Sequence, residues 1–128
     1  MRLLLDSHAF LWFCEGNNSL SPTARAAIEN PANEKFISYG TAWEIAIKLD
    51  IGKLKIQIPY ENLFPGAMDS NGFKSLSPDF RHFRELITLP RNHGDLFDRL
   101  IIAQARVEQM AVVSCDPNFA LYGVTVIW

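Results

Sequence analysis

The sequence predicts an α/β domain in three α/β/α layers, with a central parallel sheet of about five strands. Two observations lead to this prediction. Short apolar runs alternate along the chain with longer stretches of helical periodicity, and no linker or long repeat interrupts them. The 128 residues are 48% hydrophobic and 20% charged, which suits one globular domain, so we expect a single domain over residues 1–128.

The first predicted strand is Arg2–Leu5, because its almost wholly apolar run is typical of a central parallel strand covered on both faces. Four later runs share this character: Lys35–Ser38, Phe73–Leu76, Ala111–Ser114 and Val124–Ile127. Right-handed crossovers leave few topologies for such strands, and a doubly wound sheet is the simplest. In these sheets ligands bind beyond the carboxyl ends of the strands, where the strand order reverses.

Capping residues mark where the helices begin. Ser21 and Ser77 each precede a proline, a pair that predicts the start of a helix. Thr41 stands three residues before Glu44, as in a capping box, so another helix is expected from this point to about Leu49.

The longest predicted helix runs from about Asp95 to Gln109. Its apolar residues recur at helical spacing over a broad face, so it should be buried deeply against the sheet. Residues 59–69 should also be helical, with Pro65 near the start or at a kink.

Charge and cysteine content exclude several classes of protein. The formal net charge is −2, so any contact with nucleic acid must be a local basic patch. Cys14 and Cys115 form neither a disulfide framework nor a zinc motif, which suits a reducing cytoplasm. Polar residues interrupt the apolar N-terminal stretch, so we expect neither a signal peptide nor a membrane span.

Four acids fall at the expected carboxyl ends of strands or in the first turns of the helices that follow: Asp6, Glu44, Asp98 and Asp116. Each has a simple structural explanation as a helix cap or as a member of a capping box. Taken singly, capping is the simpler interpretation.

Taken together, the four acids indicate a metal site. If the first and fourth strands are neighbours, Asp6 and Asp116 face each other, and both helix starts aim their acids at the same crevice. Clustered carboxylates repel one another and become partly protonated unless a cation neutralises them. Oxygen-only ligands favour Mg²⁺ or Mn²⁺ over zinc, and such an ion suits phosphodiester hydrolysis.

Four segments together resemble a PIN-domain ribonuclease, and most closely the VapC toxins of toxin–antitoxin pairs: LLLDSHAFLW, TAWEIAIKLDIGKLKIQIP, GDLFDRLIIAQA and VVSCDPNFALYGVTVIW. The resemblance covers essentially the whole chain. It implies a PIN-like fold and an acidic quartet of catalytic metal ligands, which map onto Asp6, Glu44, Asp98 and Asp116.

Further residues match the same family pattern. Asp95 corresponds to another acid common in this branch, as a helix cap, a metal ligand or a residue that supports one. Ser114 lies where the family often has a hydroxyl, whose expected role is a hydrogen bond to a metal ligand. Leu96 departs from the pattern, because relatives often have proline there.

The resemblance implies a Mg²⁺- or Mn²⁺-dependent endoribonuclease that is the toxin partner of a VapB-type antitoxin and leaves a 5′-phosphate and a 3′-hydroxyl. Two alternatives stay open: a PIN nuclease in RNA processing without an antitoxin, and an inactive PIN-like binding module. The short length and the intact quartet argue against them. The sequence has no G-x-G-x-x-G, Walker A or G-x-S-x-G motif, so nucleotide cradling and covalent acyl chemistry lack support.

RNA contact and partner contact are predicted from local features. Arg99, Lys48 and His93 lie near the acids and could contact RNA, although a solvated face with a Glu44–Lys48 helical pair is an equal alternative. The bulky run Phe10–Phe13 cannot be covered by one sheet face, so Trp12 and Phe13 become candidates for an interface with an antitoxin or with a second subunit in a homodimer.

Overall fold

Five parallel strands form one sheet in the order β3-β2-β1-β4-β5 in the computed structural model, which describes residues 1–128. The strands are β1 (Arg2–Leu5), β2 (Glu34–Ser38), β3 (Lys74–Leu76), β4 (Ala111–Val113) and β5 (Val126–Ile127). β1 lies at the centre and pairs with β2 on one side and with β4 on the other. The predicted doubly wound sheet is confirmed, and its strand order reverses between β1 and β4.

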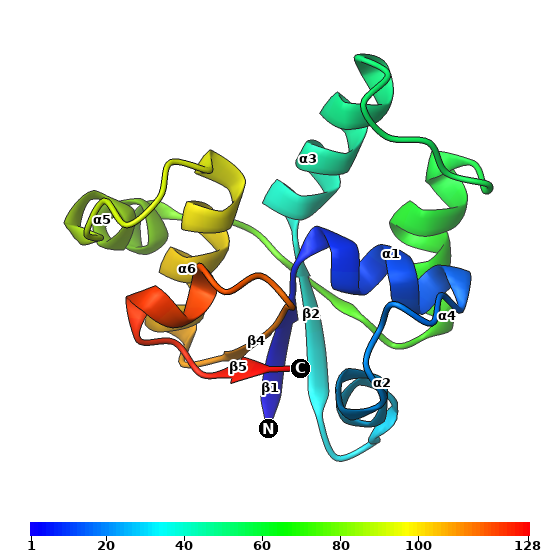
Figure 1. Cartoon of the computed structure of the whole chain (residues 1–128), viewed down its shortest axis with the longest axis horizontal. Coiled ribbons are helices and arrows are strands. Elements are labelled where there is room, and N and C mark those ends of the chain that lie inside the picture. Colours follow the sequence, from blue (N-terminus) through cyan, green and yellow to red (C-terminus); the bar gives the residue numbers. More distant parts are fainter.

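Helices cover both faces of the sheet (Figure 1). One layer contains α1 (Ser7–Glu15), α2 (Pro22–Glu29), a π-helical turn η1 (Asn62–Ala67) and α4 (Met68–Ser70), and the other contains α5 (Phe80–Thr88), α6 (Leu96–Glu108) and the 3-10 turn η2 (Phe119–Tyr122). Alternate side chains of β1 enter two separate cores, Leu3 and Leu5 on one face and Leu4 on the other. The three-layer α/β/α prediction is therefore confirmed.

α3 (Tyr39–Asp50) begins earlier than the capping box predicted. Ser38 is its N-cap, and the Ser38 hydroxyl accepts a hydrogen bond from the Gly40 N–H at 3.0 Å. Thr41 lies inside the helix and is buried, so the prediction of a Thr41–Glu44 capping box is wrong. The earlier start has a functional consequence, because it leaves the Glu44 carboxylate free of a capping role.

The start of α5 is also displaced from its prediction. Asp79, not Ser77, is the N-cap, and the His82 ring accepts a hydrogen bond from the Asp79 N–H at 2.9 Å in a reciprocal capping box. Ser21 does cap α2, as predicted. The expected helix over residues 59–69 is a π-helical turn with a cis Phe64–Pro65 bond, followed by the single turn of α4.

Gly40 allows α3 and α6 to approach each other closely. A Cβ atom at this position would lie 2.6 Å from Cδ2 of Leu100 on α6, inside any normal contact distance. The glycine therefore sets the spacing of the two helices that carry Glu44 and Asp98. No helix in the structure is long and apolar enough to cross a membrane.

Candidate active site

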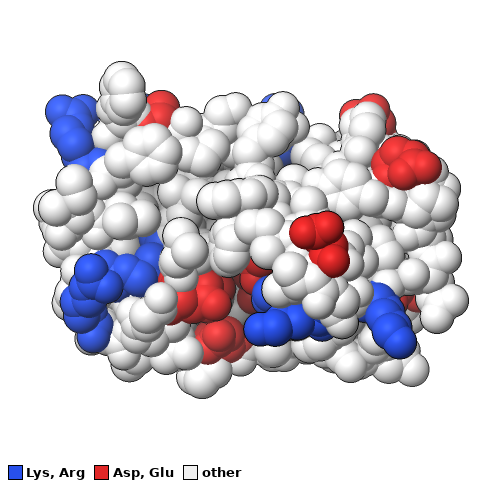
Figure 2. All heavy atoms as spheres, turned by 90° about the horizontal axis from the view of Figure 1, so that it is seen from above, with Lys and Arg blue, Asp and Glu red and all other residues white.

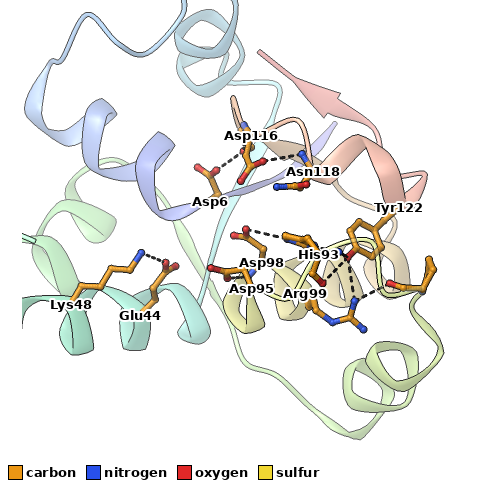
Figure 3. Close-up of polar contacts among 12 residues, drawn as sticks. Asp6, Glu44, Lys48, His93, Asp95, Asp98, Arg99, Asp116, Asn118 and Tyr122 are labelled. Carbon is orange, nitrogen blue, oxygen red and sulfur yellow. Dashed lines mark hydrogen bonds and ion pairs between the residues drawn. The ribbon is translucent and has the colours of Figure 1, made fainter. Parts of the chain in front are cut away.

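The four predicted acids lie at one edge of the sheet, where the carboxyl ends of β1 and β4 adjoin the second turn of α3, which carries Glu44, and the first turn of α6, which carries Asp98 (Figure 3). Figure 2 looks onto the molecule from above and shows a group of Asp and Glu side chains in a recess, with Lys or Arg side chains on both sides. The strand reversal between β1 and β4 brings Asp6 and Asp116 to neighbouring positions.

Asp6 is held by two hydrogen bonds. One carboxylate oxygen accepts from the Ala9 N–H at 2.8 Å and so caps α1, while the other accepts a short hydrogen bond from the Ser114 hydroxyl. Burial raises the pKa of Asp6, and both of these hydrogen bonds act in the opposite direction. Capping and membership of an acidic site are therefore not alternatives for Asp6, because one carboxylate does both.

Ser114 connects Asp6 to Asp116. While it donates to Asp6, its hydroxyl oxygen accepts from the Asp116 N–H at 3.0 Å, and the Asp116 carboxylate accepts from the Asn118 N–H at 2.9 Å. This buried hydroxyl thus makes the expected kind of hydrogen bond, to one of the four acids. It fixes the backbone on which Asp116 stands.

Glu44 is buried on α3 with only 4% of its surface exposed, and it accepts an ion-paired hydrogen bond from the Lys48 ammonium at 2.7 Å. The hydrogen bond to Glu44 raises the pKa of Lys48, and the charges of Asp95 and Asp98 add to this shift. The Glu44–Lys48 helical pair, one of the two alternatives that the sequence left open, is therefore present. It places one cation beside the acids.

Asp98 shows how strongly the acids act on one another. Burial raises its pKa to about 7, and the negative charges of Asp95, Asp116, Glu44 and Asp6 each contribute to the shift. The Asp95 carboxylate caps α6 by accepting a hydrogen bond from the Asp98 N–H at 2.9 Å. Burial and the charges of neighbouring acids therefore both disfavour the ionised form of Asp98.

Arg99 does not reach this recess. Only 6% of its surface is exposed, and its guanidinium donates to the carbonyl oxygens of Leu89 and Pro90 and to the Tyr122 hydroxyl. The prediction of an RNA contact through Arg99 is not supported, because its donors are already used inside the protein. His93 does lie at the site, with Nε2 3.4 Å from a carboxylate oxygen of Asp98.

The bulky run on α1 is mostly covered by the chain itself. Phe10 and Leu11 are buried, while Trp12 is half-buried against Trp128 and Phe13 against Phe73. Large exposed apolar side chains lie elsewhere, mainly on α3, α5 and the start of α6: Tyr39, Trp43, Phe80, Phe83, Ile87 and Leu96.

A tighter group of possible metal ligands lies outside the recess. Asp79, His82 and Glu108 are the only three such side chains whose ligand atoms all lie within 4.8 Å of one another. However, the Arg81 guanidinium donates to both carboxylates, at 2.9 Å and 2.7 Å. A cation already neutralises this group, so it is an ion-pair network between α5 and α6.

The four acids of the recess fit a hard divalent cation by their chemistry. They provide only oxygen ligands, and the charges of the neighbouring acids add to the burial that raises the pKa of Asp98. Their oxygens are more widely spaced than those of the Asp79 group.

The fold and this recess define a class: a doubly wound α/β domain with an acidic site where the strand order reverses. The sequence model of the PIN domain family matches residues 3–124, and the chain belongs to that family.

Several solved structures share the fold, and two of them are VapBC proteins. VapBC2 from Rickettsia felis, bound to a DNA fragment from its promoter, matches with a TM-score of 0.70 at 13% identity over 98% of this chain and 97% of that one. VapBC-1 from nontypeable Haemophilus influenzae matches with a TM-score of 0.65 at 14% identity over 98% of this chain and 96% of that one. No curated protein matches the sequence.

Proposed function

We propose that this chain, a single PIN domain over residues 1–128, is a metal-dependent endoribonuclease of the VapC type and the toxin of a toxin–antitoxin pair. The observation that carries the proposal is the recess where the strand order reverses, in which Asp6, Glu44, Asp98 and Asp116 from four parts of the chain lie together. Membership of the PIN family and the fold shared with two VapBC structures support it.

Asp6, Glu44, Asp98 and Asp116 would hold a Mg²⁺ or Mn²⁺ ion, with Asp95 close enough to add negative charge. Such an ion polarises a phosphoryl oxygen and lowers the pKa of an attacking water. The protein contributes fixed positions for the acids: Ser114 orients Asp6, and Lys48 holds Glu44. We expect RNA phosphates to approach along the rim of the recess, where Lys48 and His93 lie, and cleavage to leave a 5′-phosphate and a 3′-hydroxyl.

We also propose two protein partners in the cytoplasm, a VapB-type antitoxin and a second copy of this chain. Exposed apolar side chains on three neighbouring helices support self-association, because monomers rarely leave large apolar patches uncovered. Trp43 on α3 and Ile87 on α5, 57% and 80% exposed, are the side chains we assign to the contact between copies. Half-buried Trp12 and Phe13 remain candidates for antitoxin contact.

Removing one ligand charge from the recess tests the proposed activity. Asp6→Asn, Asp98→Asn or Asp116→Asn preserves shape, so each should lower RNA cleavage by at least about 100-fold while the protein stays folded. Glu44→Gln should also lower cleavage, and it removes the ion-pair partner of Lys48. Its effect should be weaker, because this side chain is longer than that of an aspartate and can still reach the ion through water. Asp69→Asn, an exposed acid on α4, is the matched control and should cleave like the parent.

Cleavage of a single-stranded RNA in Mn²⁺ is the measurement, with circular dichroism melting to confirm folding. Parental cleavage rates in a folded Asp98→Asn protein would refute the assignment. Absence of cleavage and of Mn²⁺ binding in the parent would favour the inactive binding module. An active nuclease whose cleavage no co-encoded protein inhibits would favour RNA processing without an antitoxin.

A further inference from the structure

A network of three side chains lies behind Asp98 and connects it to the C-terminal part of the chain (Figure 3). His93 stands in the loop before α6, and its two ring nitrogens face different partners. Nε2 is 3.4 Å from an Asp98 carboxylate oxygen, and Nδ1 is 2.6 Å from the hydroxyl of Tyr122. Tyr122 is only 4% exposed, so these groups interact largely away from bulk solvent.

The contacts of the Tyr122 hydroxyl define the tautomer of His93. This oxygen accepts hydrogen bonds from the His93 backbone N–H and from the Arg99 guanidinium, both at 3.2 Å, which uses its two lone pairs. Its own proton is left to be donated, and Nδ1 of His93 is by far the nearest acceptor. With Nδ1 accepting, the ring proton resides on Nε2 and faces Asp98.

The loop that carries His93 is held independently of this ring. Arg99 donates to the carbonyl oxygen of Pro90 at 2.9 Å, and the Asn92 side chain donates to the carbonyl oxygen of Leu121 at 3.1 Å. The ring is therefore presented to Asp98 by a loop fixed at both the α6 and η2 sides. Neither of these tethers touches an acid of the recess.

We propose that His93 is a positioning residue for Asp98, and that Tyr122 sets the tautomer that makes this possible. The inference rests on the proposed function, because it concerns how one acid is prepared for a metal ion. A hydrogen bond from Nε2–H to one oxygen of Asp98 leaves the other oxygen directed at the recess. No other group of the chain makes a hydrogen bond to the Asp98 carboxylate, so without His93 nothing fixes its orientation. Groups that orient metal ligands in this way commonly change metal affinity by about 10- to 100-fold.

Mn²⁺ binding without RNA tests the inference, by titration calorimetry on the whole chain, with melting temperature measured on the same samples. His93→Ala should weaken Mn²⁺ binding by roughly 10- to 100-fold. His93→Gln should restore most of the affinity, because its amide N–H lies near the position of Nε2–H. Tyr122→Phe should also weaken Mn²⁺ binding, since without the Tyr122 hydroxyl the ring proton of His93 is no longer kept on Nε2.

Asp69→Asn, an exposed acid on α4 outside this network, is the control and should bind Mn²⁺ like the parent. The inference is overturned if folded His93→Ala keeps the parental affinity, or if His93→Gln binds as weakly as His93→Ala. Asp98→Asn separates this inference from the proposed function. If that variant still binds Mn²⁺ and cleaves RNA, the proposed function fails; if it loses both while His93→Ala loses neither, only the positioning role fails.

Discussion

Asp98 is the residue on which the other acids act most clearly. Its carboxyl ordinarily has a pKa of 3.8, and burial together with four neighbouring acids raises this to about 7. In the unfolded chain these neighbours are dispersed and the ordinary value returns. Folding without a cation therefore has an electrostatic cost that depends on pH.

Between these two pKa values the native protein holds a proton that the unfolded chain has released. Stability of the metal-free protein should therefore fall as pH rises from about 4 to about 7, and the penalty should stay constant above that range. Below the ordinary pKa both states are protonated and the penalty is absent. Thermal melting in EDTA checks this, with Asp98→Asn as the reference that cannot ionise.

The variant should become increasingly more stable than the parent across that pH range. Excess Mn²⁺ should raise the melting temperature of the parent more at about pH 8 than at about pH 5, because the ion binds the ionised carboxylate. Parallel melting curves for parent and variant at every pH, or equal melting in EDTA and Mn²⁺, would contradict the expectation.

Residue types and their places along the chain predicted that the four acids would lie together, with Ser114 and Lys48 beside them, but not the contacts of Arg99 and His93. The four acids follow strands or helix starts, and the parallel topology brings such positions to one edge. The role of Arg99 depends on the carbonyl oxygens of Leu89 and Pro90 and on Tyr122, whose proximity only the folded chain creates. The contact between His93 and Asp98 depends on the same loop.

At the scale of elements, apolar runs predicted the sheet because buried parallel strands leave little choice of residue. Helix boundaries were harder, since several polar residues near a start can each act as the cap. Ser38, not Thr41, is the N-cap of α3. Asp79, in a capping box with His82, is the N-cap of α5 in place of Ser77. Tertiary packing decides between such competitors, and sequence spacing alone does not.

The close contact of α3 with α6 can be tested at Gly40. Gly40→Ala places a methyl group against Leu100, so we expect a loss of about 1 to 3 kcal/mol in unfolding free energy and weaker Mn²⁺ binding as Glu44 and Asp98 move apart. Gly94→Ala is the control, because nothing lies within 4 Å of its added Cβ.

Adding Leu100→Val should recover part of the Gly40→Ala loss, since it shortens the opposing side chain, and a double-mutant cycle in urea would measure the coupling. Strict additivity of the two substitutions would show that the helices do not meet at this point.

At the scale of the whole molecule, the local sequence pattern did not predict which apolar side chains the folded chain buries and which it exposes. Trp12 and Phe13 are sheltered by Trp128 and Phe73, which lie far away in sequence. The helical pattern correctly implied that one sheet face could not cover the run Phe10–Phe13. It could not show that other parts of the chain do so.

Self-association should therefore depend more on α3 and α5 than on α1. Trp43→Ala combined with Ile87→Ala should lower the mass measured by light scattering toward that of one chain, with some loss of melting temperature because Trp43 also packs against Phe97. Trp12→Ala should instead leave the mass unchanged and reduce stability by about 2 kcal/mol, because it removes packing against Trp128. An unchanged mass in the double variant, or dissociation by Trp12→Ala, would place the contact elsewhere.

The hydrogen bond from Ser114 to Asp6 joins residues 108 positions apart. Ribosomes deliver the N-terminal part of a chain first, and contacts this distant form only after the later partner has emerged. β1 can pair with β2 early, but its other side has no partner until β4 has been synthesised, and only the pairing with β4 brings Asp6 to Asp116. If the proposed activity holds, an unfinished chain that stops short of β4 cannot cut RNA, so the ribosome that makes this protein is safe from it until translation has passed Asp116.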